Sequence, residues 1–355
     1  MTDWPRLAVT VGSVLAGVVS GYLAERLLLR DRDAVLRAAS PLGQIEGEQH
    51  FLPGPDGARL CVETYGPADS ASGEAVLVHG FSLMGRCWHE QVVALRDRLR
   101  LVTYDHPGHG RSSRPLSGKY SLELLADALA AVIEQATDAA SGKIVVVGHS
   151  MGGMTALACA RRHPQLFERR VGALLLLSTT AKAGAEDIAV GAGIHLLARC
   201  ERGVKIVAAL LSGRARFFAQ VYRASSDLTD ALIGRIVLVR DADPRYIQFT
   251  EQLLLNADLE TVSRLLAVLL AVDEDGTLAT VEVPTTIVGG TEDAITPIDH
   301  ARRMTRVNPD VELVELPGIG HMTPLEAHEV VNTLVTQMAE ALRQPAPDKA
   351  GGMLA

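Results

Sequence analysis

The chain has 355 residues, 48% of them hydrophobic, which is enough to bury a large core in one or two domains. It carries 34 basic and 42 acidic residues with no basic block, and this argues against a nucleic-acid partner. The four cysteines have neither metal-ligand nor paired spacing, so neither a zinc site nor a disulfide framework is indicated.

The first thirty residues contain a long uncharged apolar stretch. Residues 7–24 read LAVTVGSVLAGVVSGYLA, which as a helix would span about 27 Å, close to the thickness of a bilayer core. We therefore expect residues 1–30 to form a transmembrane anchor. Two other interpretations stay open. One is a cleaved signal peptide, because Val18 and Ser20 are small enough for a cleavage site, and the other is a buried or interfacial helix.

The arginines around this stretch predict its orientation. One precedes it and four follow it, namely Arg6 before and Arg26, Arg30, Arg32 and Arg37 after. By the positive-inside rule, an anchor with these flanks places the main domain in the cytoplasm, whereas a signal peptide would place it outside. The chain is thus expected to associate with a membrane.

After a charged linker over residues 31–47, strand and helix patterns alternate. A Pro-Asp-Gly turn separates EQHFLPG from RLCVETYG, which is typical of a hairpin. Six further apolar runs predict strands: AVLVHG, LVTYDHPGHG, KIVVVGHS, VGALLLLSTT, TTIVGG and VELVELPG. Continuous Val/Leu runs bounded by glycine are typical of strands buried on both faces of a sheet.

Helical patterns lie between these strands. They are SLELLADALAAVIEQA with Ser121 as candidate N-cap, MGGMTALACARRHP, and TPLEAHEVVNTLVTQMAEALR as one last helix. The alternation predicts an α/β fold with a mostly parallel sheet and helices on both faces. Residues 181–282 interrupt it with helical periodicity and are expected to form an inserted cap. The core then comprises residues 48–180 and 283–343, and residues 344–355 are expected to be disordered.

The stretch GHSMGG ends one of the predicted strands and starts a helix. Its first five residues fit G-x-S-x-G, in which a serine sits on a sharp strand-to-helix turn between small neighbours. The helix directs its free N–H groups toward the serine, where they can stabilise an oxyanion. Ser150 is therefore the candidate nucleophile.

A serine hydroxyl needs a base, and the base needs an orienting acid. In this motif the partners follow in the order Ser, acid, His. His321 follows the last predicted strand, at the sheet edge where open α/β sheets place their sites, and it is the candidate base. Asp293 follows the strand TTIVGG and is the candidate acid. His109 and Glu292 remain as their respective rivals.

The oxyanion needs two donors, and both are expected to be main-chain groups. One is the N–H of Met151, the residue after the nucleophile. The other belongs to the loop after AVLVHG, for which Phe81 in HGFSLMG is the candidate.

These motifs together resemble the α/β-hydrolase family over residues 48–342. The matching segments are HGF, DHPGHGRS, GHSMGG, GGTEDAITP and GIGHMTPLE, in family order. The resemblance implies an eight-stranded, mostly parallel sheet with a helical cap, and a catalytic triad of Ser150, Asp293 and His321. Because the nucleophile is serine, the chain differs from the epoxide-hydrolase and haloalkane-dehalogenase branches. Ser82 stands where cofactor-free haloperoxidase-like esterases typically carry proline, which weakens a perhydrolase interpretation.

The expected activity is hydrolysis of carboxylic esters, in the manner of an esterase or lipase, through an acyl-enzyme. The substrate would be a small-molecule or lipid ester, and no cofactor or metal is required. The same triad could instead cleave a C–C bond, transfer an acyl group to another acceptor or act as a perhydrolase. A non-catalytic binding protein on the same scaffold is a further alternative from a different class.

Overall fold

The structure is a computed structural model that describes residues 42–67, 73–138, 142–183, 237–239 and 241–343. These residues form eight strands: β1 (Glu48–Pro53), β2 (Arg59–Tyr65), β3 (Glu74–Val78), β4 (Arg100–Tyr104), β5 (Ile144–His149), β6 (Val171–Leu177), β7 (Thr285–Gly290) and β8 (Glu312–Leu316). The helices are α3 (His89–Leu95), α4 (Leu122–Ala136), α5 (Met151–Arg162), α6 (Pro164–Arg170), α11 (Pro244–Leu255), α12 (Leu259–Leu269), α13 (Asp275–Leu278), α14 (Ile298–Val307), α15 (Thr323–Glu326) and α16 (His328–Arg343). Two 3₁₀ turns, η1 (Pro55–Gly57) and η3 (Gly85–Trp88), complete the described elements.

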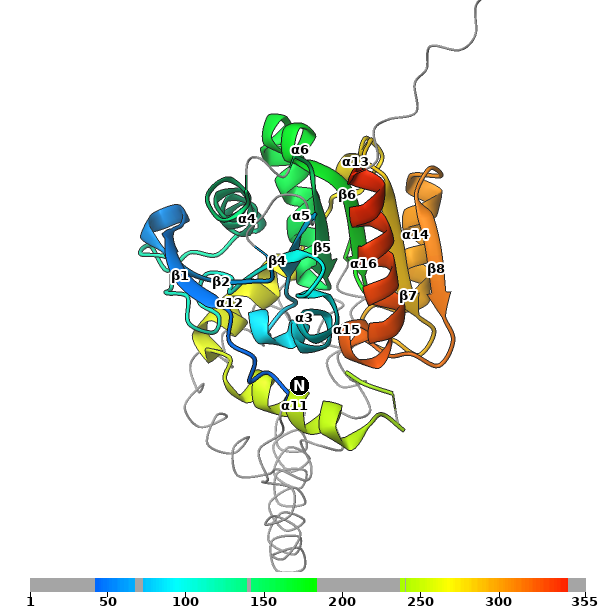
Figure 1. Ribbon diagram of the computed structural model, residues 1–355, viewed down its shortest axis with the longest axis horizontal. Helices are drawn as coiled ribbons and strands as arrows, with labels where there is room; N and C mark the ends of the chain where they lie inside the picture. Colours follow the sequence, from blue (N-terminus) through cyan, green and yellow to red (C-terminus); the bar gives the residue numbers. More distant parts are fainter. Residues whose placement is uncertain (1–41, 68–72, 139–141, 184–236, 240, 344–355) are drawn as a thin grey trace, which may run out of the picture.

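The strands form one sheet in the order β1-β2-β4-β3-β5-β6-β7-β8, seen in Figure 1 from β1 in blue to β8 in orange. β2 pairs antiparallel with both of its neighbours, and every other pairing is parallel. The predicted mostly parallel sheet is therefore confirmed. Because the parallel strands share one direction, the loops after β3, β5, β7 and β8 all leave from the same edge of the sheet.

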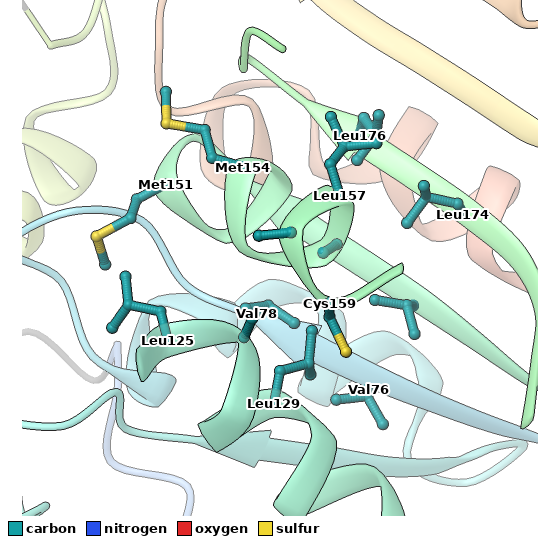
Figure 2. Close-up of a cluster of buried hydrophobic side chains, with 14 of the residues drawn as sticks. Val76, Val78, Leu125, Leu129, Met151, Met154, Leu157, Cys159, Leu174 and Leu176 are labelled. Atoms are coloured by element: carbon teal, nitrogen blue, oxygen red, sulfur yellow. The ribbon is translucent and has the colours of Figure 1, made fainter. Parts of the chain in front are cut away.

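Alternate residues of the central strands enter two separate cores, one on each face of the sheet. Val76 and Val146 belong to the core that α4 and α5 cover. Figure 2 shows part of this core, with Val76 of β3 beside Leu129 of α4 and Cys159 of α5. Leu77 and Val147, one residue further along each strand, belong to the core that α3 and α16 cover. This alternation is the two-residue period of a strand, and it explains why the runs are apolar at every position.

Two sequence predictions need correction. The run VELVELPG was expected to be buried on both faces, but β8 pairs only with β7, so it is an edge strand, and Glu312 and Glu315 on it are exposed. The last helix was expected to be continuous, but Ala327, with φ −128° and ψ 34°, separates α15 from α16. The apolar spacing continues across that single residue, so a periodicity argument cannot detect the break.

The described part of the predicted cap, residues 181–183, 237–239 and 241–282, contains helices α11, α12 and α13. Arg114, in the loop before α4, pairs with Asp258 and Glu260 at the start of α12. The hydroxyl of Tyr120 lies 2.8 Å from that of Thr261. These contacts join α12 to the loop that follows β4.

Several predicted segments lie wholly or partly outside the described residues: the anchor over 1–30, most of the linker over 31–47, residues 184–236 and 240 of the cap, and the tail over 344–355. The end of the linker is described, and Leu42 is buried there against the core. Within the described ranges, no helix has the length and apolarity that crossing a membrane requires.

Candidate active site

Ser150 lies at the turn between β5 and α5 with φ 53° and ψ −118°, a backbone conformation that non-glycine residues rarely adopt. Such a residue costs of order 1–3 kcal/mol and persists only where its surroundings fix it. Here the Ser150 N–H donates to the carbonyl of Leu177 at 2.9 Å, and its own carbonyl accepts from the Thr179 hydroxyl at 2.7 Å. Hydrogen bonds from the end of β6 and the residues after it therefore stabilise the strained backbone of Ser150.

The glycines on either side of Ser150 are required by close backbone contacts. A Cβ on Gly148 would lie 2.7 Å from backbone atoms of Gly152 and Gly153. A Cβ on Gly152 would lie 2.1 Å from the carbonyl oxygen of Val78 in β3. Neither contact leaves room for a side chain, so the first glycine is required by packing against the first turn of α5 and the second by packing of α5 against β3.

His321 lies beside Ser150 although 171 residues separate them in the chain. Its Nε2 is 3.0 Å from the Ser150 Oγ, and its Nδ1 is 2.9 Å from Oδ2 of Asp293. Because a carboxylate only accepts, Nδ1 carries the proton in this arrangement, and Nε2 is free to accept from the serine hydroxyl. The sequence-predicted nucleophile, base and acid are thus brought together in one hydrogen-bonded series.

Asp293 is fixed by its own loop. Its Oδ1 accepts from the backbone N–H groups of Ile295 and Thr296, and its Oδ2 accepts from the Thr296 hydroxyl at 2.8 Å. Burial on its own would raise the pKa of Asp293, but the His321 imidazole and these hydrogen bonds outweigh it and hold the pKa below the usual range. The rival acid Glu292 is exposed, so the structure favours Asp293.

The two predicted oxyanion donors belong to the residue after the serine and to the loop that follows β3. Met151 is the first residue of α5, where a backbone N–H has no partner within the helix. Phe81 follows Gly80, at which an added Cβ would lie 3.2 Å from the Ser150 Cβ, so this loop packs against the nucleophile. The next residue, Ser82, has φ 60°, a value that proline cannot adopt. The loop in this conformation therefore differs from a proline-bearing one.

Four further histidines are buried near this site, and we call them the buried histidine group: His79, His106, His109 and His149. Burial lowers the pKa of His79 to about 4 and those of His109 and His149 to about 3. The described partners of the group's ring nitrogens are backbone groups and the hydroxyl of Tyr104. His109, the rival base, contacts the ring of His79, whereas the hydroxyl of Ser150 contacts His321.

The sequence interpretation missed several groups that hold the candidate base and acid. They are Thr296 against Asp293, and His149 and Glu326 around the backbone of His321. A glutamate within one helical turn of free N–H groups is a weak signal that could have indicated Glu326. Thr296 is three residues after Asp293, a spacing typical of local side-chain turns, whereas nothing in the sequence indicates the contact of His149. Within the described ranges, no cluster of three or more potential metal ligands is found.

Comparison with known proteins identifies the family. The sequence profile described as "Alpha/beta hydrolase family" matches residues 75–333. The dihydrolipoyllysine-residue acetyltransferase component of the acetoin cleaving system of Pseudomonas putida is 30% identical over 96% of this chain and 82% of that protein. The pimeloyl-[acyl-carrier protein] methyl ester esterase of Chromobacterium violaceum is 30% identical over 81% of this chain and 99% of that protein.

Among solved structures, a thermophilic esterase from Thermogutta terrifontis superposes with a TM-score of 0.65 and 25% identity, covering 84% of this chain and all of that one. This structural similarity covers most of the chain. Together with the profile match and the fold described above, it identifies the chain as a member of the alpha/beta hydrolase family.

Proposed function

We propose that the protein is a serine hydrolase that cleaves carboxylic esters through an acyl-enzyme intermediate. The observation that carries this proposal is the series of contacts from Ser150 Oγ through the His321 imidazole to the Asp293 carboxylate. The geometry matches the requirement that a nucleophile contact its base and the base contact an orienting group.

In the first half of the reaction, the Ser150 oxygen attacks the ester carbonyl while His321 Nε2 takes the hydroxyl proton. The amides of Met151 and Phe81 donate to the oxygen that becomes negative. When the tetrahedral intermediate collapses, the carbon–oxygen bond to the alcohol breaks, and His321 returns the proton to the leaving alkoxide. Asp293 stabilises the imidazolium throughout without taking the proton itself.

In the second half, a water molecule takes the place of the alcohol. His321 removes one of its protons as its oxygen attacks the acyl carbon. The second tetrahedral intermediate releases the carboxylic acid and restores the Ser150 hydroxyl with the proton that His321 held. No step uses a cofactor.

An ester substrate is supported by the relatives, two of which are named esterases. Another relative is named an acetyltransferase component, so the acceptor of the acyl group is the part of the proposal that product analysis must decide. The apolar stretch of residues 265–272 gives no guide to acyl-chain length, because Leu265, Leu269 and Val272 are buried in the core cluster beside α4 and α5. Membrane attachment through residues 1–30 remains a prediction.

The test is Ser150→Ala with a panel of p-nitrophenyl esters of increasing acyl length. We expect kcat to fall by about four to six orders of magnitude. A fluorophosphonate probe should label the native chain at Ser150 and should not label the variant. Near-native turnover in Ser150→Ala would overturn the proposal, and failure of the native chain to react with the probe would favour a binding protein instead.

A further inference from the structure

Glu326 is the last residue of α15, and its side chain turns back toward the loop that carries His321. Its Oε1 accepts the N–H of Met322 at 2.9 Å. Its Oε2 accepts the N–H of Gly320 at 3.3 Å and the N–H of Val239 at 2.9 Å. One carboxylate therefore accepts three backbone N–H groups from two segments that are far apart in the chain.

Two of these N–H groups belong to the residues immediately before and after His321. The backbone of His321 itself is also held, because its N–H donates to the carbonyl of Val237 at 3.1 Å. Its carbonyl lies 2.9 Å from Nε2 of His149, which must be the donor since a carbonyl only accepts. The main chain on both sides of the imidazole is thus fixed by specific hydrogen bonds.

The packing at Gly320 shows how closely these segments approach. A Cβ on this glycine would lie 2.9 Å from the backbone nitrogen of Val239 and 3.0 Å from Oε1 of Glu326. The loop, the carboxylate and residues 237–239 are therefore in close contact at Gly320. Hydrogen bonds to a charged acceptor are also stronger and shorter than neutral ones, which adds to this restraint.

We infer that Glu326 is a positioning residue that holds the His321 imidazole in line with Ser150 and joins its loop to the cap segment Val237–Val239. The inference rests on the proposed function, since it assumes that His321 is the base. Glu326 does not touch the reacting atoms, so its effect passes through the backbone of His321. A displacement of about 1 Å at a catalytic group can lower a rate about 100-fold.

The experiment compares Glu326→Ala and Glu326→Gln in the full-length protein, with kcat expressed per site titrated by a fluorophosphonate. We expect Glu326→Ala to lower kcat about 100-fold and Glu326→Gln about tenfold. The glutamine keeps one acceptor oxygen but turns an NH₂ group toward the remaining N–H donors. We expect KM to change less than about twofold in both variants, because neither removes a substrate contact.

Glu74→Gln is the matched control, because Glu74 is a buried carboxylate at the opposite end of the sheet. It pairs with Arg100 at 3.0 Å and accepts the N–H of Asp138 at 3.1 Å. It should lower the melting temperature while kcat per titrated site stays native. Native kcat per titrated site in both Glu326 variants would overturn the inference, as would a loss confined to KM. Near-native activity in His321→Ala would overturn the proposed function itself.

Discussion

Five of the histidines near the carboxyl edge of the sheet, His321 and the buried histidine group, fall into two environments. His321 contacts an aspartate on one ring nitrogen and a serine hydroxyl on the other. The buried histidine group meets mainly carbonyl oxygens and backbone N–H groups, and burial lowers the pKa values of its members. The ring of His149 is only 5.1 Å from that of His321. The carboxylate and the hydroxyl on its ring nitrogens, and not its location, therefore distinguish His321 from the buried histidine group.

The largest expected effect on kcat is that of replacing His321 by glutamine, compared with the same replacement of His109 in the buried histidine group. We expect His321→Gln to lower kcat by about four to six orders of magnitude, because an amide cannot take the serine proton. His109→Gln should leave kcat within the native order of magnitude. The measurement is steady-state hydrolysis of a p-nitrophenyl ester at pH 7.5. A large loss in His109→Gln with little loss in His321→Gln would reverse the assignment of the base.

The next effect tests the carboxylate directly. We expect Asp293→Asn to lower kcat about 10⁴-fold, because the amide can donate to Nδ1 and favour the wrong tautomer of His321. The matched variant is Glu292→Gln at the exposed neighbouring position, for which we expect native kcat. If the two variants lost activity equally, the orienting role of Asp293 would be wrong.

The smallest expected effect is on stability. It is a pH dependence of the free energy of unfolding that arises from the buried histidine group. The folded-state pKa values of His79 and His109, about 4 and 3, lie below the ordinary value of 6.5. Between pH 6.5 and about 4 the unfolded chain therefore binds protons that the folded protein does not, so the free energy of unfolding decreases as the pH falls. Each histidine contributes a slope of about 1.4 kcal/mol per pH unit within its window.

Urea unfolding at several pH values between 4.5 and 7 measures this slope. We expect His109→Gln to reduce the slope of the free energy of unfolding against pH by about 1.4 kcal/mol per pH unit, the contribution of one histidine, because glutamine does not titrate. An unchanged slope in this variant would show that the His109 imidazole does not resist protonation in the folded protein.

The sequence predicted the strands and the turn at Ser150 well, because both depend on local patterns. The apolar runs place each strand, and Gly148 packs against the backbone of Gly152 and Gly153, only a few residues further along the chain. Asp293 and His321 were also predictable, because parallel strands bring the loops that follow them to one edge. These three side chains are the part of the site that chain order and topology specify.

Other features depend on packing between distant segments, and the sequence does not reveal them. Glu326 accepts an N–H from Val239, a contact 87 residues away that no spacing rule suggests. The burial of the buried histidine group cannot be inferred from the sequence either, because the local sequence around a histidine is the same whether its ring is buried or exposed. The partial exposure of β8 follows from its having a single neighbour, which is a property of the whole sheet.

The long segment between β6 and β7 has a consequence for synthesis on the ribosome. β6, with the sequence VGALLLL, pairs along its far edge with β7, which begins about a hundred residues later. At translation rates of about 5–20 residues per second, that edge waits about 5–20 s for its partner. During this interval an apolar strand edge is open to pairing with another nascent chain. Expression yield should therefore respond to translation speed across residues 181–284 more than elsewhere in the gene.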